Sequence, residues 1–213
     1  MNLLELVEHV KSNYLRDSQD QELWSAQELI TYFNAAQNLF ARHTHCLIDT
    51  DVVVTTASSI ARYTLDPKII YVYEVYDSDG RRVHRHNRRK LPRSLYEGKP
   101  LGFTQDTGTA SIRFSPTPDD EYTFSLLVAR LPSKPLARQY DVPEIPEEYH
   151  IDLCDYVAYM AVRNNDTESS EIQAGNNFRT DWETKLRDAK RNTYHYRIGS
   201  NSQAVNNWTG SGR

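Results

Sequence analysis

The sequence predicts an α+β fold: a four-helix bundle from the N- and C-terminal segments, an inserted small antiparallel β-sandwich or barrel domain, and an extended C-terminal tail. Three observations support this prediction. Apolar residues recur at helical spacing towards both ends of the 213-residue chain. Short runs rich in β-branched and aromatic residues fill the middle. Pro143 and Pro146 separate the strand-like part from the helices that follow.

The chain accordingly divides into four predicted segments. Residues 1–44 form an N-terminal helical hairpin, 45–142 an inserted β domain, 143–196 the C-terminal helices, and 197–213 a tail. The tail consists mainly of Ser, Asn, Gly and Gln, and it has too little apolar surface to order itself. Helices that flank a β insertion pack most simply against one another, so we expect one bundle from which the β domain projects.

The first two helices are predicted from periodicity and from one capping signal. The first helix spans residues 3–16. The second begins in a capping box, because Ser25 is followed three residues later by Glu28. The expected apolar faces comprise Leu3, Val7, Val10 and Tyr14 in the first helix and Leu29, Ile30, Phe33, Ala36 and Phe40 in the second.

Five strands are predicted from composition in the middle of the chain. They cover residues 52–56, 69–76, 81–85, 110–114 and 122–130. Asp79-Gly80 favours a tight hairpin, so residues 81–85 are expected to return antiparallel to the preceding strand. Residues 116–120 form the expected turn between the last two strands. Residues 88–106 show little periodicity and are predicted to be a long loop.

The proline junction predicts the change from strands to helices. Pro143 and Pro146 cannot donate ladder hydrogen bonds, and Pro146 suits the first turn of a helix. The two glutamates after Pro146 then lie where a helix dipole favours negative charge. A third helix is expected around residues 153–161, and a fourth is expected to end near Tyr196.

Composition excludes several classes of protein. The formal net charge of −4 gives no general attraction to nucleic acid. No apolar run of about 18 residues exists, so we expect no membrane span. The first residues lack a basic region, which argues against a secretory signal. Cys46 and Cys154 lie far apart, and two free thiols are expected rather than a disulfide.

One basic run stands out against this background. It holds seven cationic residues and no acid: Arg81, Arg82, Arg85, Arg88, Arg89, Lys90 and Arg93. Three roles remain open for it: a solvated hairpin and loop, contact with an acidic patch on another protein or on a neighbouring copy, or contact with DNA phosphates. No aromatic residue interleaves the run, which weakens binding to single strands.

The candidate metal and catalytic patterns have simpler structural explanations. His43, His45 and Cys46 follow a helix, whereas His84 and His86 lie among arginines that repel a cation, so no metal or cofactor is expected. Three acidic pairs suggest hydrolase chemistry: 49/51, 119/120 and 147/148. Each pair also suits a strand edge, a turn or a helix start. The sequence lacks a P-loop, a nucleophile elbow and an HExxH motif, so catalysis is not expected.

Ordered fragments across residues 20–196 resemble the head-to-tail connector (adaptor) proteins of tailed bacteriophages. The fragments are Trp24-Ser-Ala-Gln-Glu-Leu-Ile30, Tyr32-Phe-Asn-Ala-Ala-Gln37, Tyr63-Thr-Leu-Asp-Pro67, Phe114-Ser-Pro-Thr-Pro118, Arg130-Leu-Pro132, Pro143-Glu-Ile-Pro-Glu-Glu-Tyr-His150 and Asn165-Asp-Thr-Glu168. Each fragment is weak alone, and the signal comes from their order and spacing.

The resemblance implies a structural, non-enzymatic virion protein made in the host bacterial cytoplasm. It implies a homo-oligomeric ring, typically of twelve copies, at the head–tail junction. Such a ring docks on the portal protein, its β domain faces tail or nozzle proteins, and double-stranded DNA passes through its channel. Residues 197–213 match no family motif. From their position and composition, Ile198, Val205 and Trp208 are expected to dock on the portal. The alternatives are a nucleic-acid-binding protein that uses residues 81–93, or a hydrolase.

Overall fold

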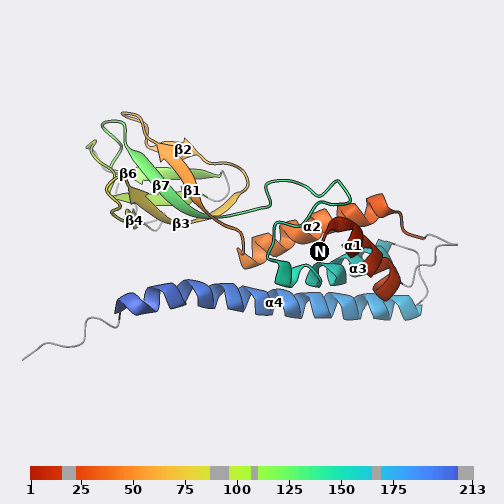
Figure 1. Cartoon of the computed structure of the whole chain (residues 1–213). Coiled ribbons are helices and arrows are strands. Elements are labelled where there is room, and N and C mark those ends of the chain that lie inside the picture. The colour runs from red at the N-terminus through yellow and green to blue at the C-terminus, as the bar shows by residue number, and fades with distance from the viewer. Residues whose placement is uncertain (16–22, 87–95, 107–109, 165–168, 206–213) are drawn as a thin grey trace, which may run out of the picture. The chain divides into compact units, whose positions relative to one another are not determined.

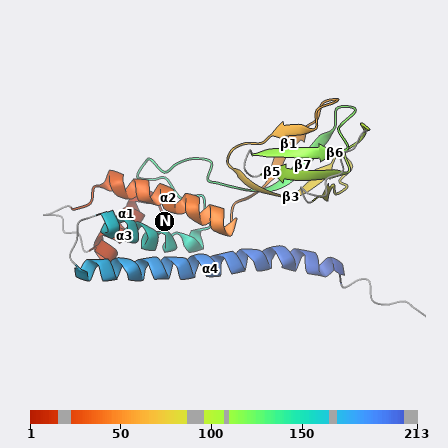
Figure 2. The same cartoon turned by 180° about the vertical axis from the view of Figure 1, so that it is seen from behind.

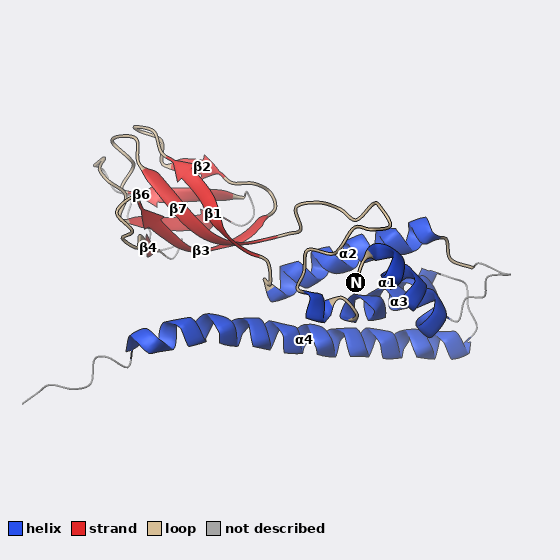
Figure 3. Cartoon of the chain, viewed as in Figure 1, coloured by secondary structure: helices blue, strands red, loops and turns tan. Residues whose placement is uncertain are grey.

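The computed structural model describes residues 1–15, 23–86, 96–106, 110–164 and 169–205 (Figure 1). The chain forms two compact units. One unit combines Met1–Cys46 with Pro132–Arg213, and the other spans Leu47–Leu131. The described helices belong to the first unit and the described strands to the second (Figure 3). The predicted α+β class is therefore confirmed.

The helical unit consists of segments from both ends of the chain. Its elements are α1 (Leu3–His9), a π-helix η1 (Val10–Leu15), α2 (Ala26–Thr44), a short 3₁₀-helix η2 (Glu147–Tyr149), α3 (Asp152–Asn164) and α4 (Ser169–Val205). Helices α2, α3 and α4 lie side by side in both views of the molecule (Figures 1 and 2). Residues of α1, η1, α2, α3 and α4 contribute to one hydrophobic core.

The first helix differs from its prediction in geometry. Asn2 and Glu5 form a capping box at its start, with hydrogen bonds of 3.0 and 2.9 Å to each other's backbone N–H groups. From Val10 onwards the predicted α-helix continues as the π-helix η1. The wider turns change the direction of the side chains that follow. Tyr14 packs there against Phe178, with 5.5 Å between the ring centroids.

Helix α2 begins and packs as its sequence predicts. Ser25 accepts a hydrogen bond of 3.2 Å from the N–H of Glu28, which is one half of a capping box. The Glu28 carboxylate accepts from the Tyr32 hydroxyl at 2.7 Å. Of the expected apolar face, Leu29, Phe33, Ala36 and Phe40 are buried, and Ile30 is half-buried. Phe40 meets Trp182 of α4, with ring centroids 5.9 Å apart.

Residues 132–145 pack with the helical unit, although the β domain was expected to extend to residue 142. Asn34 of α2 accepts from the N–H of Leu136 and donates to its carbonyl, both at 2.8 Å. Asp141 accepts from the N–H groups of Ala137 and Arg138, both at 2.7 Å. These contacts satisfy backbone groups that a strand would have paired in a sheet.

The strands of the second unit form two open sheets. The bounds are β1 Ile48–Thr55, β2 Arg62–Thr64, β3 Ile69–Asp77, β4 His84–Arg85, β5 Gly102–Asp106, β6 Ser111–Ser115 and β7 Thr123–Arg130. One sheet has the order β1-β7-β3, and the other has the order β2-β6-β5-β4. Both sheets contribute to one core, in which Phe114 of β6 stacks on Phe124 of β7 at 4.6 Å between centroids.

The predicted hairpin after β3 is present only in its first residues. Asp77 accepts from the N–H groups of Asp79 and Arg81, and Gly80 has a φ of 74°. Beyond this turn, a single bridge joins Tyr76 to Arg82, and β4 then pairs in parallel with β5. The N–H of Val83 also donates to the carbonyl of Val75 at 2.8 Å, so the predicted return strand over residues 81–85 pairs with β3 as far as Val83 and then leaves it.

Side chains from the other sheet explain why the hairpin stops. The Gln105 side chain accepts from the N–H of Val72 at 2.8 Å, and Arg85 donates to the carbonyl of Val72 at 2.6 Å. The edge of β3 is thus occupied at the point where a hairpin strand would pair. The predicted loop over residues 88–106 is also wrong at its end, because β5 begins at Gly102.

Helix α4 continues to Val205, beyond its predicted end near Tyr196. Residues 197–205, the first part of the predicted extended tail, are therefore helical. Trp208, also in that tail, lies outside the described residues. Among the helices that the structure describes, none combines the length and the apolar composition needed to span a membrane.

Candidate functional site

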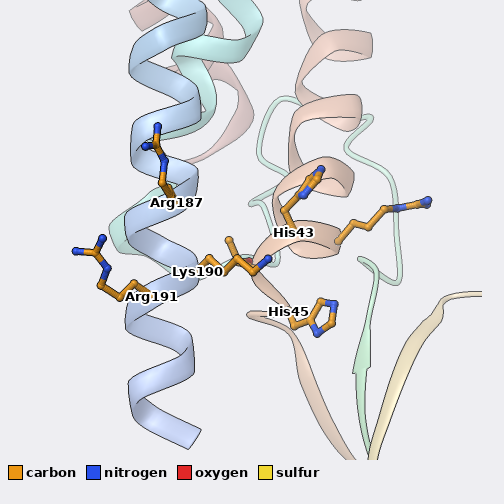
Figure 4. Close-up of a pocket in the computed structure, with 7 residues that line it drawn as sticks. His43, His45, Arg187, Lys190 and Arg191 are labelled. Atoms are coloured by element: carbon orange, nitrogen blue, oxygen red, sulfur yellow. The ribbon is translucent and has the colours of Figure 1, made fainter. Parts of the chain in front are cut away.

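A basic hollow of about 370 Å³ lies between the end of α2 and α4 (Figure 4). It is lined by Arg42, His43, Thr44 and His45 from the end of α2, and by Arg187, Lys190 and Arg191 from α4. We call these seven residues the basic site. Four of them are permanent cations and two are histidines, and none is acidic.

The way in which α2 ends places the histidines at this site. The Thr44 hydroxyl donates to the carbonyl of Phe40 at 2.8 Å, and the N–H of His45 donates to the carbonyl of Ala41 at 2.8 Å. His45 has a φ of 55°, in the left-handed region where helices often end. The chain therefore turns sharply at His45, and Figure 4 shows His43 on the last turn of α2 and His45 where the chain leaves that helix.

Helix α4 supplies its three cations from residues that flank its buried face. Trp182 and Ala189 are buried in the core, which fixes the rotation of the helix. Arg187, Lys190 and Arg191 are exposed. In Figure 4, Lys190 extends towards the end of α2, whereas Arg191 extends away from it.

The cations of the basic site are not neutralised within the described chain. Neither Arg42 nor the three cations of α4 form an ion pair with another described residue. Arg187 and Arg191 are four residues apart on a helix, where like charges repel each other. This arrangement favours an anion, with arginine forks suited to carboxylate or phosphate oxygens.

A second cluster of charges on α4 is neutralised inside the helical unit. Lys185 donates to the buried Asp155 at 2.6 Å and lies 3.4 Å from Asp152. Burial lowers the pKa of Lys185, but the hydrogen bond and charge of Asp155 outweigh it, so the pKa is raised. Burial also raises the pKa of Asp152. The cluster holds α3 and α4 together.

The hydroxyl of Tyr14 and the thiol of Cys154, both uncharged, lie next to the Lys185–Asp155 ion pair. Burial and the nearby Asp155 raise the pKa of the Tyr14 hydroxyl, which hydrogen-bonds that carboxylate. The same two causes raise the pKa of the Cys154 thiol to about 12, so this thiol is protonated at neutral pH. Cys46 and Cys154 are both free, as the sequence predicted.

Part of the predicted basic run is engaged within the β unit. Arg82 pairs with Glu74 at 3.0 Å. Besides its bond to Val72, the guanidinium of Arg85 lies 4.2 Å from the centroid of the Tyr71 ring. Arg81 is exposed. The remaining candidates, Arg88, Arg89, Lys90 and Arg93, lie outside the described residues.

The structure does not join the predicted histidine pairs into a metal site. Within the described ranges, no three His, Cys, Asp or Glu side chains are grouped so as to hold a metal ion. His86 packs closely on Gly102, where an added Cβ would lie 2.1 Å from the ring. His43 and His45 belong to the basic site, whose cations oppose a metal ion.

The acidic pairs have structural partners. Asp49 lies 3.4 Å from Arg130 and accepts from the N–H of Asp51. Asp119 accepts from the Tyr122 hydroxyl at 2.8 Å.

Of the expected portal contacts, Ile198 and Val205 fall within α4. The sequence interpretation missed the basic site, although Arg187, Lys190 and Arg191 carry a helical charge spacing that indicates one shared surface.

Comparison with protein families gives a match over almost the whole chain. The family model described as SU10 adaptor protein matches residues 1–206. A search of the curated proteins finds no match to this sequence. The family match spans both compact units, including the basic site and the β unit.

Proposed function

The chain belongs to the SU10 adaptor protein family, and from this premise we propose that it forms a ring joining the portal vertex of a phage head to the tail. Membership of a phage adaptor family indicates a structural protein of the virion. The match over residues 1–206 carries the proposal, because it spans both units of the chain. It also confirms the resemblance that the ordered sequence fragments predicted.

In this proposal, twelve copies surround a channel through which double-stranded DNA leaves the head. The helices act as a bundle whose sides meet neighbouring copies. Many identical contacts make a durable joint even when each contact is weak. Two units with separate cores support this function, because each unit offers its own surface to a partner.

The two ends of the joint use different residues in this proposal. Ile198, Val205 and Trp208 attach the C-terminal segment to the portal protein. Arg81, together with the basic residues at positions 88–93, meets tail or nozzle proteins or the passing DNA. Arg82 and Arg85 contribute less, because each already has a partner inside the β unit. We propose no catalytic role.

Shortening the chain tests the portal attachment. A chain that ends at Tyr196 is expected to keep both units folded and to lose attachment to portal rings, because it lacks Ile198, Val205 and Trp208. Circular dichroism checks the fold, and electron microscopy of the protein alone and mixed with its portal checks attachment. The matched control removes only residues 210–213.

Two results would contradict the proposal in different ways. If the chain that ends at Tyr196 still decorates portal rings, the attachment role of the C-terminal segment is wrong. If the intact chain forms no ring in the presence of its portal, the ring function itself is wrong.

A further inference from the structure

We propose that the basic site holds an acidic segment of a partner protein, whose carboxylates neutralise Arg42, Arg187, Lys190 and Arg191. This inference rests on the proposed function only because it places the chain in a protein assembly. It adds the chemistry of one contact, at a surface distinct from the C-terminal segment and from the basic run of the β unit.

The first argument is electrostatic. Arg187 and Arg191 repel each other across one turn of α4, and Lys190 lies between them in sequence. Lys185 is close by on the same helix and has two carboxylates, at 2.6 and 3.4 Å. The three cations of the basic site have no such partner among the described residues, so an incoming anion relieves their repulsion.

Helix ends alone do not explain this charge. The negative end of the α2 dipole favours Arg42 and His43 in the last turn of that helix. The same dipole acts only over the last turn and gives no reason for three further cations on α4. Those residues are far from both ends of α4, which spans Ser169–Val205. Their charge therefore calls for a partner outside the described chain.

The second argument is the shape of the basic site. Its volume of about 370 Å³ suits a few side chains, near the lower end of the range for ligand pockets. Specific contacts with duplex DNA instead cover about 1,000–2,500 Å² of protein surface. Lys190 extends across the hollow, while Arg191 extends away (Figure 4), so the cations do not form a row that follows a phosphate backbone. Glutamate or aspartate side chains on an extended segment fit this arrangement better.

A peptide-binding experiment with the full-length chain tests the proposal. The probe is a fluorescein-labelled peptide of alternating glutamate and glycine, measured by fluorescence polarisation at low and moderate salt. The variant Arg187→Gln/Lys190→Gln/Arg191→Gln is expected to weaken binding by about tenfold or more, because it removes three charge-assisted contacts. Its matched control, Arg113→Gln/Lys134→Gln/Arg138→Gln, removes the same charge from exposed residues elsewhere and is expected to change binding by less than about twofold.

Two outcomes would overturn the inference. Equal losses in the two variants would show that the peptide senses only the overall charge of the protein. Tighter binding of a short DNA duplex than of the peptide, lost in the site variant alone, would assign the basic site to phosphates. Thermal melting of each variant confirms that it is folded.

Electron microscopy separates this inference from the ring function. Wild-type protein that binds the peptide but forms no ring with its portal would contradict the ring and support the basic site. Wild-type protein that forms rings but shows no peptide binding would contradict the basic site and leave the ring intact.

Discussion

Two sets of cations lie within two turns of one another on α4, yet they meet different surroundings. Lys185 contacts Asp155 and Asp152 of α3 within the helical unit. Arg187, Lys190 and Arg191 line the hollow beside the end of α2 and form no ion pair with another described residue. Both sets are basic residues on one helix, so their charge does not tell their roles apart. A cation that contacts a buried carboxylate stabilises the fold, and we call it a structural cation. A cation without such a contact is available to a partner.

The largest expected effect comes from removing the structural cation. Lys185→Met leaves Asp155 buried without a counter-charge, and breaking such pairs is strongly destabilising. Breaking a buried ion pair typically costs about 3–5 kcal/mol. Because the Lys185 side chain is 38% exposed, we expect the free energy of unfolding to fall by the lower value, about 3 kcal/mol. Urea unfolding followed by circular dichroism measures the change.

Lys190→Met is the matched control on the same helix. Lys190 has no ion pair with a described residue, so its free energy of unfolding is expected to change by no more than about 0.5 kcal/mol. Equal losses in the two variants would erase the distinction between the two sets of cations.

The same comparison holds for two arginines of the β unit. Both residues are exposed, but Arg85 donates to Val72 at 2.6 Å and stacks on Tyr71, whereas Arg81 forms no ion pair with another described residue. Arg85→Ala leaves the buried Val72 carbonyl without this donor and is expected to cost about 1 kcal/mol. Arg81→Ala is its control, with an expected change near zero. Thermal melting of both variants checks the difference, and a larger effect of Arg81→Ala would contradict it.

Sequence reasoning predicted elements well where local signals were strong. Helix α2 followed from a cap at Ser25 and an apolar face, and β7 followed from a run of apolar and aromatic residues. Strand β5 was missed because three consecutive residues from Gly102 to Thr104 are buried, so its sequence does not alternate as that of a strand with one solvated face would. The π-helical turns after His9 leave no signal in a pattern of apolar residues.

The contacts between segments that are distant in the chain could not be predicted from the sequence. Strands β6 and β7 were both predicted, but their membership of different sheets depends on packing. The basic site joins the end of α2 to α4, segments separated by more than half of the chain. The charge spacing on α4 was visible in the sequence, whereas its meeting with Arg42 and His45 required the fold.

The smallest effect concerns a carboxylate that organises residues 132–145. Hydrogen bonds from the N–H groups of Arg138 and Ala137 lower the pKa of Asp141. A lowered folded pKa contributes stability above the unfolded pKa, near 3.9, and this contribution is lost as the pH falls through the folded value. Asp141→Asn is therefore expected to be less stable than the wild type at pH 7, and the difference is expected to shrink below about pH 4. Urea midpoints measured across this range test the sign. A difference that stays constant under acid conditions would mean that the Asp141 charge contributes nothing, and that the loop is held by shape and neutral hydrogen bonds alone.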